Sequence, residues 1–227
     1  MDFRAEQEML GSVLGWLVHR VSEYKTEFNV PWGYCDVVGC TLSARRTLRR
    51  LRLGQKQTIG PLERVSVLWE IPEARSGTAV SLSDLMEKLA PLISPSKLVE
   101  ELTVLESRGF LKRVEGCAFQ RENGWFPLQE KLIAIELKLD RIAEVIEQAE
   151  RHLLFADESY IALPMSTARA IARSSRKYDL RRRGIGLIGV SANASKTILA
   201  AARSRQIDPV VQAHCVERFW RTSLISN

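Results

Sequence analysis

The run Leu132-Ile133-Ala134-Ile135-Glu136-Leu137-Lys138-Leu139 places two opposite charges inside an otherwise apolar segment. Side chains alternate across a β-strand, so we expect Glu136 and Lys138 to project from one face and Ile135 and Leu137 from the other. Burying charge costs several kcal/mol unless the charge is paired or bound to a metal. The pattern therefore favours an active site, and a structural Glu136–Lys138 pair at a sheet edge is the alternative.

A second carboxylate, Asp36, lies in the apolar-flanked run Tyr34-Cys35-Asp36-Val37-Val38. Together with Glu136 and Lys138, this aspartate resembles the signature of the PD-(D/E)XK nuclease superfamily, in which an Asp near a strand end is followed by Glu-x-Lys on the neighbouring strand. Two features depart from that pattern. Asp36 and Glu136 are 100 positions apart, and Cys35 stands where the family has a proline.

The resemblance implies an α/β fold of the restriction-endonuclease-like type, a mixed sheet flanked by helices. It also implies a metal-dependent nuclease in which Asp36 and Glu136 bind Mg²⁺ or Mn²⁺, with the backbone carbonyl of Leu137 as a possible third ligand. Lys138 would orient or help deprotonate the attacking water and stabilise the developing charge. For the site to exist, the strands at 34–42 and 131–139 must pair.

Two further residues are candidates for the same site. Glu6 begins the helix expected over 6–21 and lies on its apolar face, so we expect it as an auxiliary metal ligand; a solvated charge at the helix N-terminus is the alternative. Gln148 resembles the glutamine that some branches of the superfamily place beside the site. A surface glutamine is the alternative, because Gln148 is one residue away from the apolar stripe of its helix.

Regular α/β alternation follows residue 129. We expect strands at 131–139, 159–163 and 185–191, helices at 141–153 and 166–178, and helices from there to the end of the chain. Helices that alternate with apolar strands indicate a sheet covered on both faces. The sequence thus predicts one discontinuous nuclease-like domain, 1–42 and 129–227.

The segment 62–128 resembles a winged-helix domain inserted into this fold, which accounts for the distance between Asp36 and Glu136. Ser81 begins a short helix, and Ser94-Pro95 opens a second helix that ends at Gly109. Two strands joined by a polar turn follow and form the expected wing. Residues 43–61 join the two parts as a linker rich in basic residues.

Basic residues of the linker and of the winged helix are candidate contacts to a phosphate backbone. They are Arg45, Arg46, Arg49, Arg50, Arg52, Lys97, Arg108, Lys112 and Arg113. Runs of charge are often only solvated surface, and acidic residues on the second helix of the insertion make it a poor reader of the major groove. A role in protein docking is therefore the alternative for the winged helix.

The 33 basic and 27 acidic residues give a net charge of +6, which tilts the chain towards polyanionic partners. We expect DNA rather than RNA as the substrate, a cytoplasmic location without membrane association, and a homodimer or larger complex as a possible assembly. The four cysteines lack zinc-finger spacing and are interpreted as reduced core thiols. Two alternatives stay open: a non-catalytic DNA-binding regulator on a nuclease-fold scaffold, and a subunit that acts on RNA or only inside a complex.

Overall fold

The computed structural model describes residues 3–114, 117–122 and 124–220 of the chain. The chain divides into two compact units. The first unit comprises Met1–Thr41 and Gln129–Asp208, and the second comprises Leu42–Leu128 and the C-terminal segment that begins at Pro209. No helix in the described part of the chain is both long enough and apolar enough to span a membrane.

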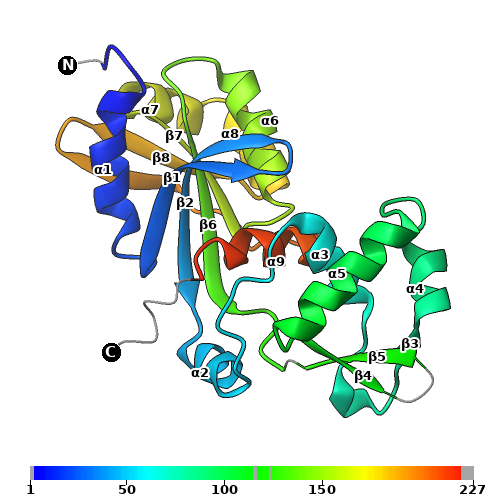
Figure 1. The fold of residues 1–227 in the computed structure, drawn as a ribbon. Helices are drawn as coiled ribbons and strands as arrows, with labels where there is room; N and C mark the ends of the chain where they lie inside the picture. Colours follow the sequence, from blue (N-terminus) through cyan, green and yellow to red (C-terminus); the bar gives the residue numbers. More distant parts are fainter. Residues whose placement is uncertain (1–2, 115–116, 123, 221–227) are drawn as a thin grey trace. The chain divides into compact units, whose positions relative to one another are not determined.

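The first unit is built around a six-stranded sheet with the strand order β1-β2-β6-β7-β8-β9 (Figure 1). The strands are β1 (Glu23–Val30), β2 (Gly33–Leu42), β6 (Gln129–Leu137), β7 (Glu158–Pro164), β8 (Gly186–Ser191) and β9 (Ala194–Leu199). β1 and β2 are antiparallel, β6, β7 and β8 run parallel, and β9 returns antiparallel to β8. This mixed sheet confirms the α/β class.

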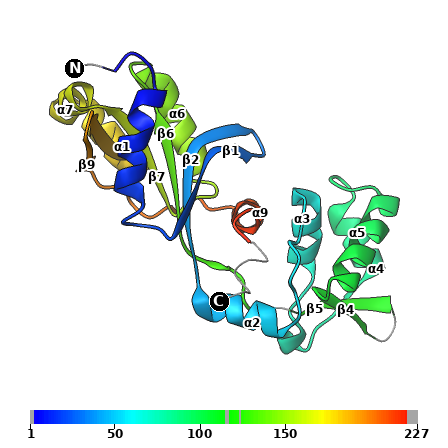
Figure 2. The same cartoon turned by 60° about the vertical axis from the view of Figure 1, so that its left-hand side comes forward.

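Helices cover both faces of this sheet. They are α1 (Gln7–Leu17), α6 (Ile142–His152), α7 (Met165–Arg173) and α8 (Arg176–Arg183). α1 packs on the face that carries Ile133, Ile135 and Leu137 of β6, whereas α6, α7 and α8 pack on the opposite face. Figures 1 and 2 show α1 and α6 on opposite sides of the strands. Because neighbouring residues of β6 face opposite ways, Glu136 points towards α6.

The second unit has its own antiparallel sheet with the order β3-β5-β4. Its elements are α2 (Ala44–Arg52), α3 (Leu62–Glu70), a 3-10 turn (Ala74–Ser76), β3 (Val80–Ser81), α4 (Leu82–Leu89), α5 (Pro95–Ser107), β4 (Leu111–Val114), β5 (Ala118–Arg121) and α9 (Pro209–Glu217). The hydroxyls of Ser81 and Ser94 cap α4 and α5 by accepting backbone N–H groups. Gly109 follows α5 with a φ of 72°, a left-handed conformation that favours glycine.

β9 corrects the expectation that helices run from the strand at 185–191 to the end of the chain. It pairs with β8 across the turn Ala192-Asn193. Thr197 and Ile198 are β-branched and favour a strand, but the turn carries no glycine, so the usual hairpin signal is missing. The helix expected over 166–178 is also divided, because α7 ends at Arg173 and α8 begins at Arg176.

The domain ranges differ from the expected ones at two places. Residues 43–61, expected as a linker, contain α2 and belong to the second unit, and α9, expected in the nuclease-like domain, packs against α3 of that unit. The segment 62–128 contributes α3, α4, α5 and a small sheet that is separate from the main one. β3 adds a third strand to the expected two-stranded wing.

Candidate functional site

Asp36 and Glu136 come from neighbouring strands, β2 and β6, although 100 positions separate them. The Asp36 Oδ2 atom accepts a hydrogen bond of 2.7 Å from the backbone N–H of Leu137. Asp36 lies near the start of β2 and Leu137 ends β6, so the start of one strand meets the end of the other, as in an antiparallel pair. The pairing expected for segments 34–42 and 131–139 is present.

Glu136 is only 2% exposed and lies among side chains of α6 and β2. The His152 Nε2 atom at the end of α6 is 3.4 Å from Glu136 Oε1. Cys35, the residue before Asp36, donates its thiol proton to the backbone carbonyl of Val37 at 3.4 Å. Ligand-type atoms of Cys35, Glu136 and His152 all lie within 4.8 Å of one another, and the three residues are buried.

The pKa of Glu136 is raised to about 9, chiefly by burial and then by the charge of Asp36 and a hydrogen bond with its side chain; Lys138 acts in the opposite direction. Burial, helped by the charge of Arg151, lowers the pKa of His152 to about 4. Without a cation, the site at neutral pH therefore holds a protonated carboxyl beside a neutral imidazole. A divalent cation beside Glu136 would favour its ionised form.

Lys138 and Glu6 lie at the same end of the sheet. The expectation that Glu136 and Lys138 project from one face is wrong. Glu136 contacts His152 of α6, whereas the Lys138 ammonium is 3.3 Å from Glu6 Oε2 at the start of α1, which packs on the other face. β6 ends at Leu137, so strand alternation does not determine where Lys138 points. A cavity of about 110 Å³ opens beside them. It is lined by Glu6, Gln7, Leu10, Thr26, Glu27, Asp36 and Leu137. The structure thus groups Glu6, Asp36, Glu136 and Lys138 around the C-terminal end of β6.

Gln148 lies one helical turn before His152, so both side chains belong to the same face of α6. Gln148 Oε1, Glu136 Oε1 and His152 Nδ1 are buried, and none has a hydrogen-bond partner among the residues that the structure describes. Buried polar atoms are almost always hydrogen-bonded, to protein or to ordered water. Three unpartnered atoms on this side of the sheet indicate a place for water or an ion.

The donor atoms fit a hard divalent cation. Asp36 and Glu136 offer carboxylate oxygens, the ligands that Mg²⁺ and Mn²⁺ prefer, and the unpartnered Oε1 atom of Glu136 is one of them. Glu6 adds a carboxylate at the rim of the cavity. Cys35 and His152, which the sequence interpretation did not assign to the site, add softer donors on the other side of Glu136. The four-residue spacing of Gln148 and His152 was the available signal for the histidine.

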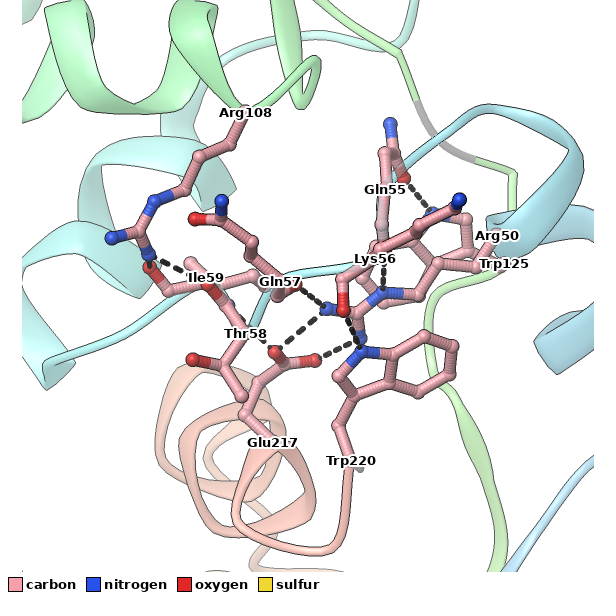
Figure 3. Close-up of polar contacts among 10 residues, drawn as sticks. All are labelled: Arg50, Gln55, Lys56, Gln57, Thr58, Ile59, Arg108, Trp125, Glu217 and Trp220. Carbon is pink, nitrogen blue, oxygen red and sulfur yellow. Dashed lines mark hydrogen bonds and ion pairs between the residues drawn. The ribbon is translucent and has the colours of Figure 1, made fainter. Parts of the chain in front are cut away.

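The prediction that Arg50 contacts nucleic acid is wrong. Arg50 is fully buried in the second unit, where its guanidinium pairs with Glu217 of α9 (Figure 3). It also donates a hydrogen bond of 2.8 Å to the Gln57 carbonyl, and it lies 3.9 Å from the ring centroid of Trp220 and 4.4 Å from that of Trp125. A buried charge needs such partners. Arg50 is on the inward side of α2 and ties the following loop to α9.

The outward side of α2 carries Arg45, Arg49 and Arg52, which are exposed. Their spacing of four and three residues places them on one face of the helix, and we call this group the α2 basic face. Arg46 is half-buried and donates a hydrogen bond of 2.7 Å to the Pro127 carbonyl. The basic stretch of the sequence therefore divides into the exposed α2 basic face and two residues that are half-buried or fully buried, Arg46 and Arg50.

The basic residues expected on the winged helix already have partners in the second unit. Three form ion pairs, Lys97–Glu101, Lys112–Glu122 and Arg113–Glu106. Arg108 donates a hydrogen bond of 2.8 Å to the Thr58 carbonyl and a second one to Ile59 (Figure 3). A phosphate backbone would have to compete with these contacts.

Comparisons with known proteins give little to set beside this geometry. No protein-family model matches the chain, and no curated protein matches it. Among solved structures, the chain is similar to the SPO1766 protein of unknown function from Silicibacter pomeroyi, with 13% sequence identity and a TM-score of 0.29. That similarity covers 54% of this chain and 79% of the other.

Proposed function

We propose that the protein is a metal-dependent nuclease that hydrolyses phosphodiester bonds in DNA, with its active site in the first unit. The observation that carries the proposal is that Asp36 and Glu136, from distant parts of the chain, lie next to each other at the C-terminal end of β6, which Lys138 follows. The resemblance to the PD-(D/E)XK superfamily supports the same assignment, with a restriction-endonuclease-like sheet in the first unit and a winged helix inserted in it.

Each residue has a defined task in this proposal. Asp36 and Glu136 would hold Mg²⁺ or Mn²⁺, which when bound supplies positive charge to the phosphate and acidity to water. Lys138 offers a compact ammonium that orients the water and stabilises negative charge on the phosphate. Glu6 holds the Lys138 ammonium at 3.3 Å and keeps it near the cavity, while Gln148 supplies a polar atom on the α6 side.

Substrate binding is assigned to the second unit. The α2 basic face presents three exposed arginines from one side of a helix, a pattern suited to contacts with successive phosphates. Three helices followed by a two-stranded wing support the winged-helix interpretation of the segment from α3 to β5. The alternative function, a DNA-binding regulator without catalysis, is favoured by the same basic face, because binding there requires neither Asp36 nor Glu136.

Variants that separate cleavage from binding test the proposal. Glu136→Gln removes a metal ligand and Lys138→Ala removes the water-orienting cation, so each should reduce the single-turnover cleavage rate by at least about a hundredfold. Binding of the same DNA should change little, because these interactions act mainly in the transition state. Glu144→Gln on the exposed side of α6 and Lys196→Ala on β9 are matched controls.

Two results would contradict the proposal. Cleavage by Glu136→Gln at the wild-type rate would place the chemistry elsewhere. Wild-type protein that binds DNA but cleaves neither DNA nor RNA with any divalent metal would favour the DNA-binding regulator.

A further inference from the structure

Cys35, Glu136 and His152 form a buried group of three different donors, which shares Glu136 with the proposed active site. Their exposed fractions are 0%, 2% and 2%, and they come from β2, β6 and α6. Thiolate, imidazole and carboxylate together are a ligand set for Zn²⁺ and similar transition-metal ions, whereas Mg²⁺ prefers oxygen alone. We infer that these three residues bind one thiophilic divalent cation of the Zn²⁺ class.

The geometry is close to what such an ion requires. Ligands at about 2.0–2.3 Å around a tetrahedral ion lie roughly 3.3–3.8 Å from one another. The His152 Nε2 and Glu136 Oε1 atoms are already 3.4 Å apart, and all three donor atoms lie within 4.8 Å of one another. Binding would require a side-chain rotation that brings the sulfur into range. Three protein ligands leave a fourth coordination position open.

A second observation points to a ligand at this place. Glu136 Oε1 is buried and lacks a hydrogen-bond partner in the described part of the chain, despite the nearby imidazole. An unpaired buried acceptor is unfavourable, and an ion would satisfy it. Asp36 is half-buried, lines the cavity beside α1 and lies next to Glu136.

Binding changes the bonds of Cys35. Its thiol proton, which is shared with the carbonyls of Val37 and Ile135, leaves to solvent as the sulfur–metal bond forms. The carboxyl proton of Glu136 leaves in the same way as its oxygen binds the ion. No redox change takes place, so no other reactant is required. The site shares Glu136 with the proposed nuclease centre but does not depend on cleavage, because the ion can bind whether or not the protein hydrolyses DNA.

Cobalt spectroscopy on metal-stripped full-length protein tests the inference. Cys117 is exposed and is first replaced by Ser, so that a surface thiol does not bind the probe. Titration with Co²⁺ should then give a thiolate-to-cobalt absorption band that saturates at one equivalent. Cys35→Ser should remove the band and weaken binding at least about tenfold. Cys40→Ser, the same change at another buried cysteine of β2, should leave both unchanged.

A second measurement keeps the inference testable. If Cys35→Ser does not fold, X-ray absorption at the zinc edge of the Cys117→Ser protein, loaded with Zn²⁺, should still show one sulfur and nitrogen or oxygen neighbours. A titration without a thiolate band, or a band that survives in folded Cys35→Ser, would overturn the inference. A thiolate–cobalt band in a protein that cleaves no nucleic acid would support this metal site and contradict the nuclease proposal. Cleavage by a protein without such a band would support the nuclease proposal and contradict this metal site.

Discussion

At the scale of single residues, burial and the charge of Asp36 both raise the pKa of Glu136. Its carboxyl is almost inaccessible, and Asp36 adds a second negative charge next to it, so its pKa rises to about 9. His152 lies on the other side, with a pKa lowered to about 4. The metal-free site is consequently neutral on the α6 side, and its ionisation is coupled to folding and to cation binding.

We predict that raising the pH from about 6.5 to about 8 destabilises the metal-free protein. In the folded protein, Glu136 keeps its proton up to about pH 9, whereas an unfolded glutamate releases it at its ordinary pKa of 4.5. Rising pH therefore stabilises the unfolded state relative to the folded state over this interval. The loss should be about 2 kcal/mol at most, since one pKa unit corresponds to about 1.4 kcal/mol.

The measurement is the melting temperature at several pH values with chelator present. Glu136→Gln should remove the slope, and saturating Mg²⁺ should reduce it. His152 titrates below this interval, because its lowered pKa costs stability only as the pH falls below the ordinary value of 6.5. An equal slope in wild type and Glu136→Gln would show that Glu136 is not protonated in the folded protein.

Arg50 has a structural role that its place in a run of basic residues does not indicate. Replacing Glu217 with Ala leaves the buried guanidinium without its counter-charge, and we expect a loss of about 3–5 kcal/mol in the free energy of unfolding of the second unit. Urea denaturation followed by tryptophan fluorescence suits this measurement, since Trp125 and Trp220 lie against Arg50.

Glu106→Ala is the matched control for Glu217→Ala. It removes one partner of the exposed Glu106–Arg113 pair and should cost less than about 1 kcal/mol. Equal effects of the two substitutions would mean that the Arg50–Glu217 pair contributes no more than a surface ion pair does.

At the scale of elements, the sequence predicts best where a local rule acts. Ser81 and Ser94 mark helix starts because a hydroxyl caps free N–H groups, and the apolar strands β6, β7 and β8 are recognisable from composition. The sequence does not predict β9, because its turn lacks a glycine signal. It predicts a linker in place of α2, because no local pattern distinguishes the one inward-facing arginine from the exposed ones. Which arginine faces inward depends on Glu217, more than 160 residues away, and no local rule encodes that contact.

The α2 basic face makes a prediction at this scale. Replacing Arg45, Arg49 and Arg52 together with Ala should weaken DNA binding and flatten its salt dependence, because each lost phosphate contact lowers the slope by roughly 0.7 to 0.9. Filter binding at several salt concentrations gives both quantities. Arg75→Ala combined with Lys88→Ala removes two cations that are paired with acidic residues elsewhere in the second unit and serves as the control. Unchanged affinity and slope in the triple variant would mean that the face is only solvated.

At the scale of the whole molecule, the sequence predicts an α/β unit interrupted by a helical segment. The structure has two units with boundaries at 41/42, 128/129 and 208/209. The meeting of Asp36 with β6 was predictable because the resemblance demanded paired strands. Cys35 and His152 were not, because their proximity to Glu136 depends on how β2 and α6 pack around it. The return of α9 to the second unit likewise depends on packing against α3.

Cleavage by the wild-type protein tests the central claim most directly. Purified protein is incubated with labelled single-stranded, double-stranded and branched DNA and with RNA, in Mg²⁺, in Mn²⁺ or in chelator, and the products are resolved on denaturing gels. We predict cleavage of DNA that requires the metal, stops with chelator and resumes when excess metal is restored. Cleavage that continues at the same rate in chelator, or intact substrates under every metal condition despite binding, would contradict the assignment of Asp36 and Glu136 as a catalytic metal site.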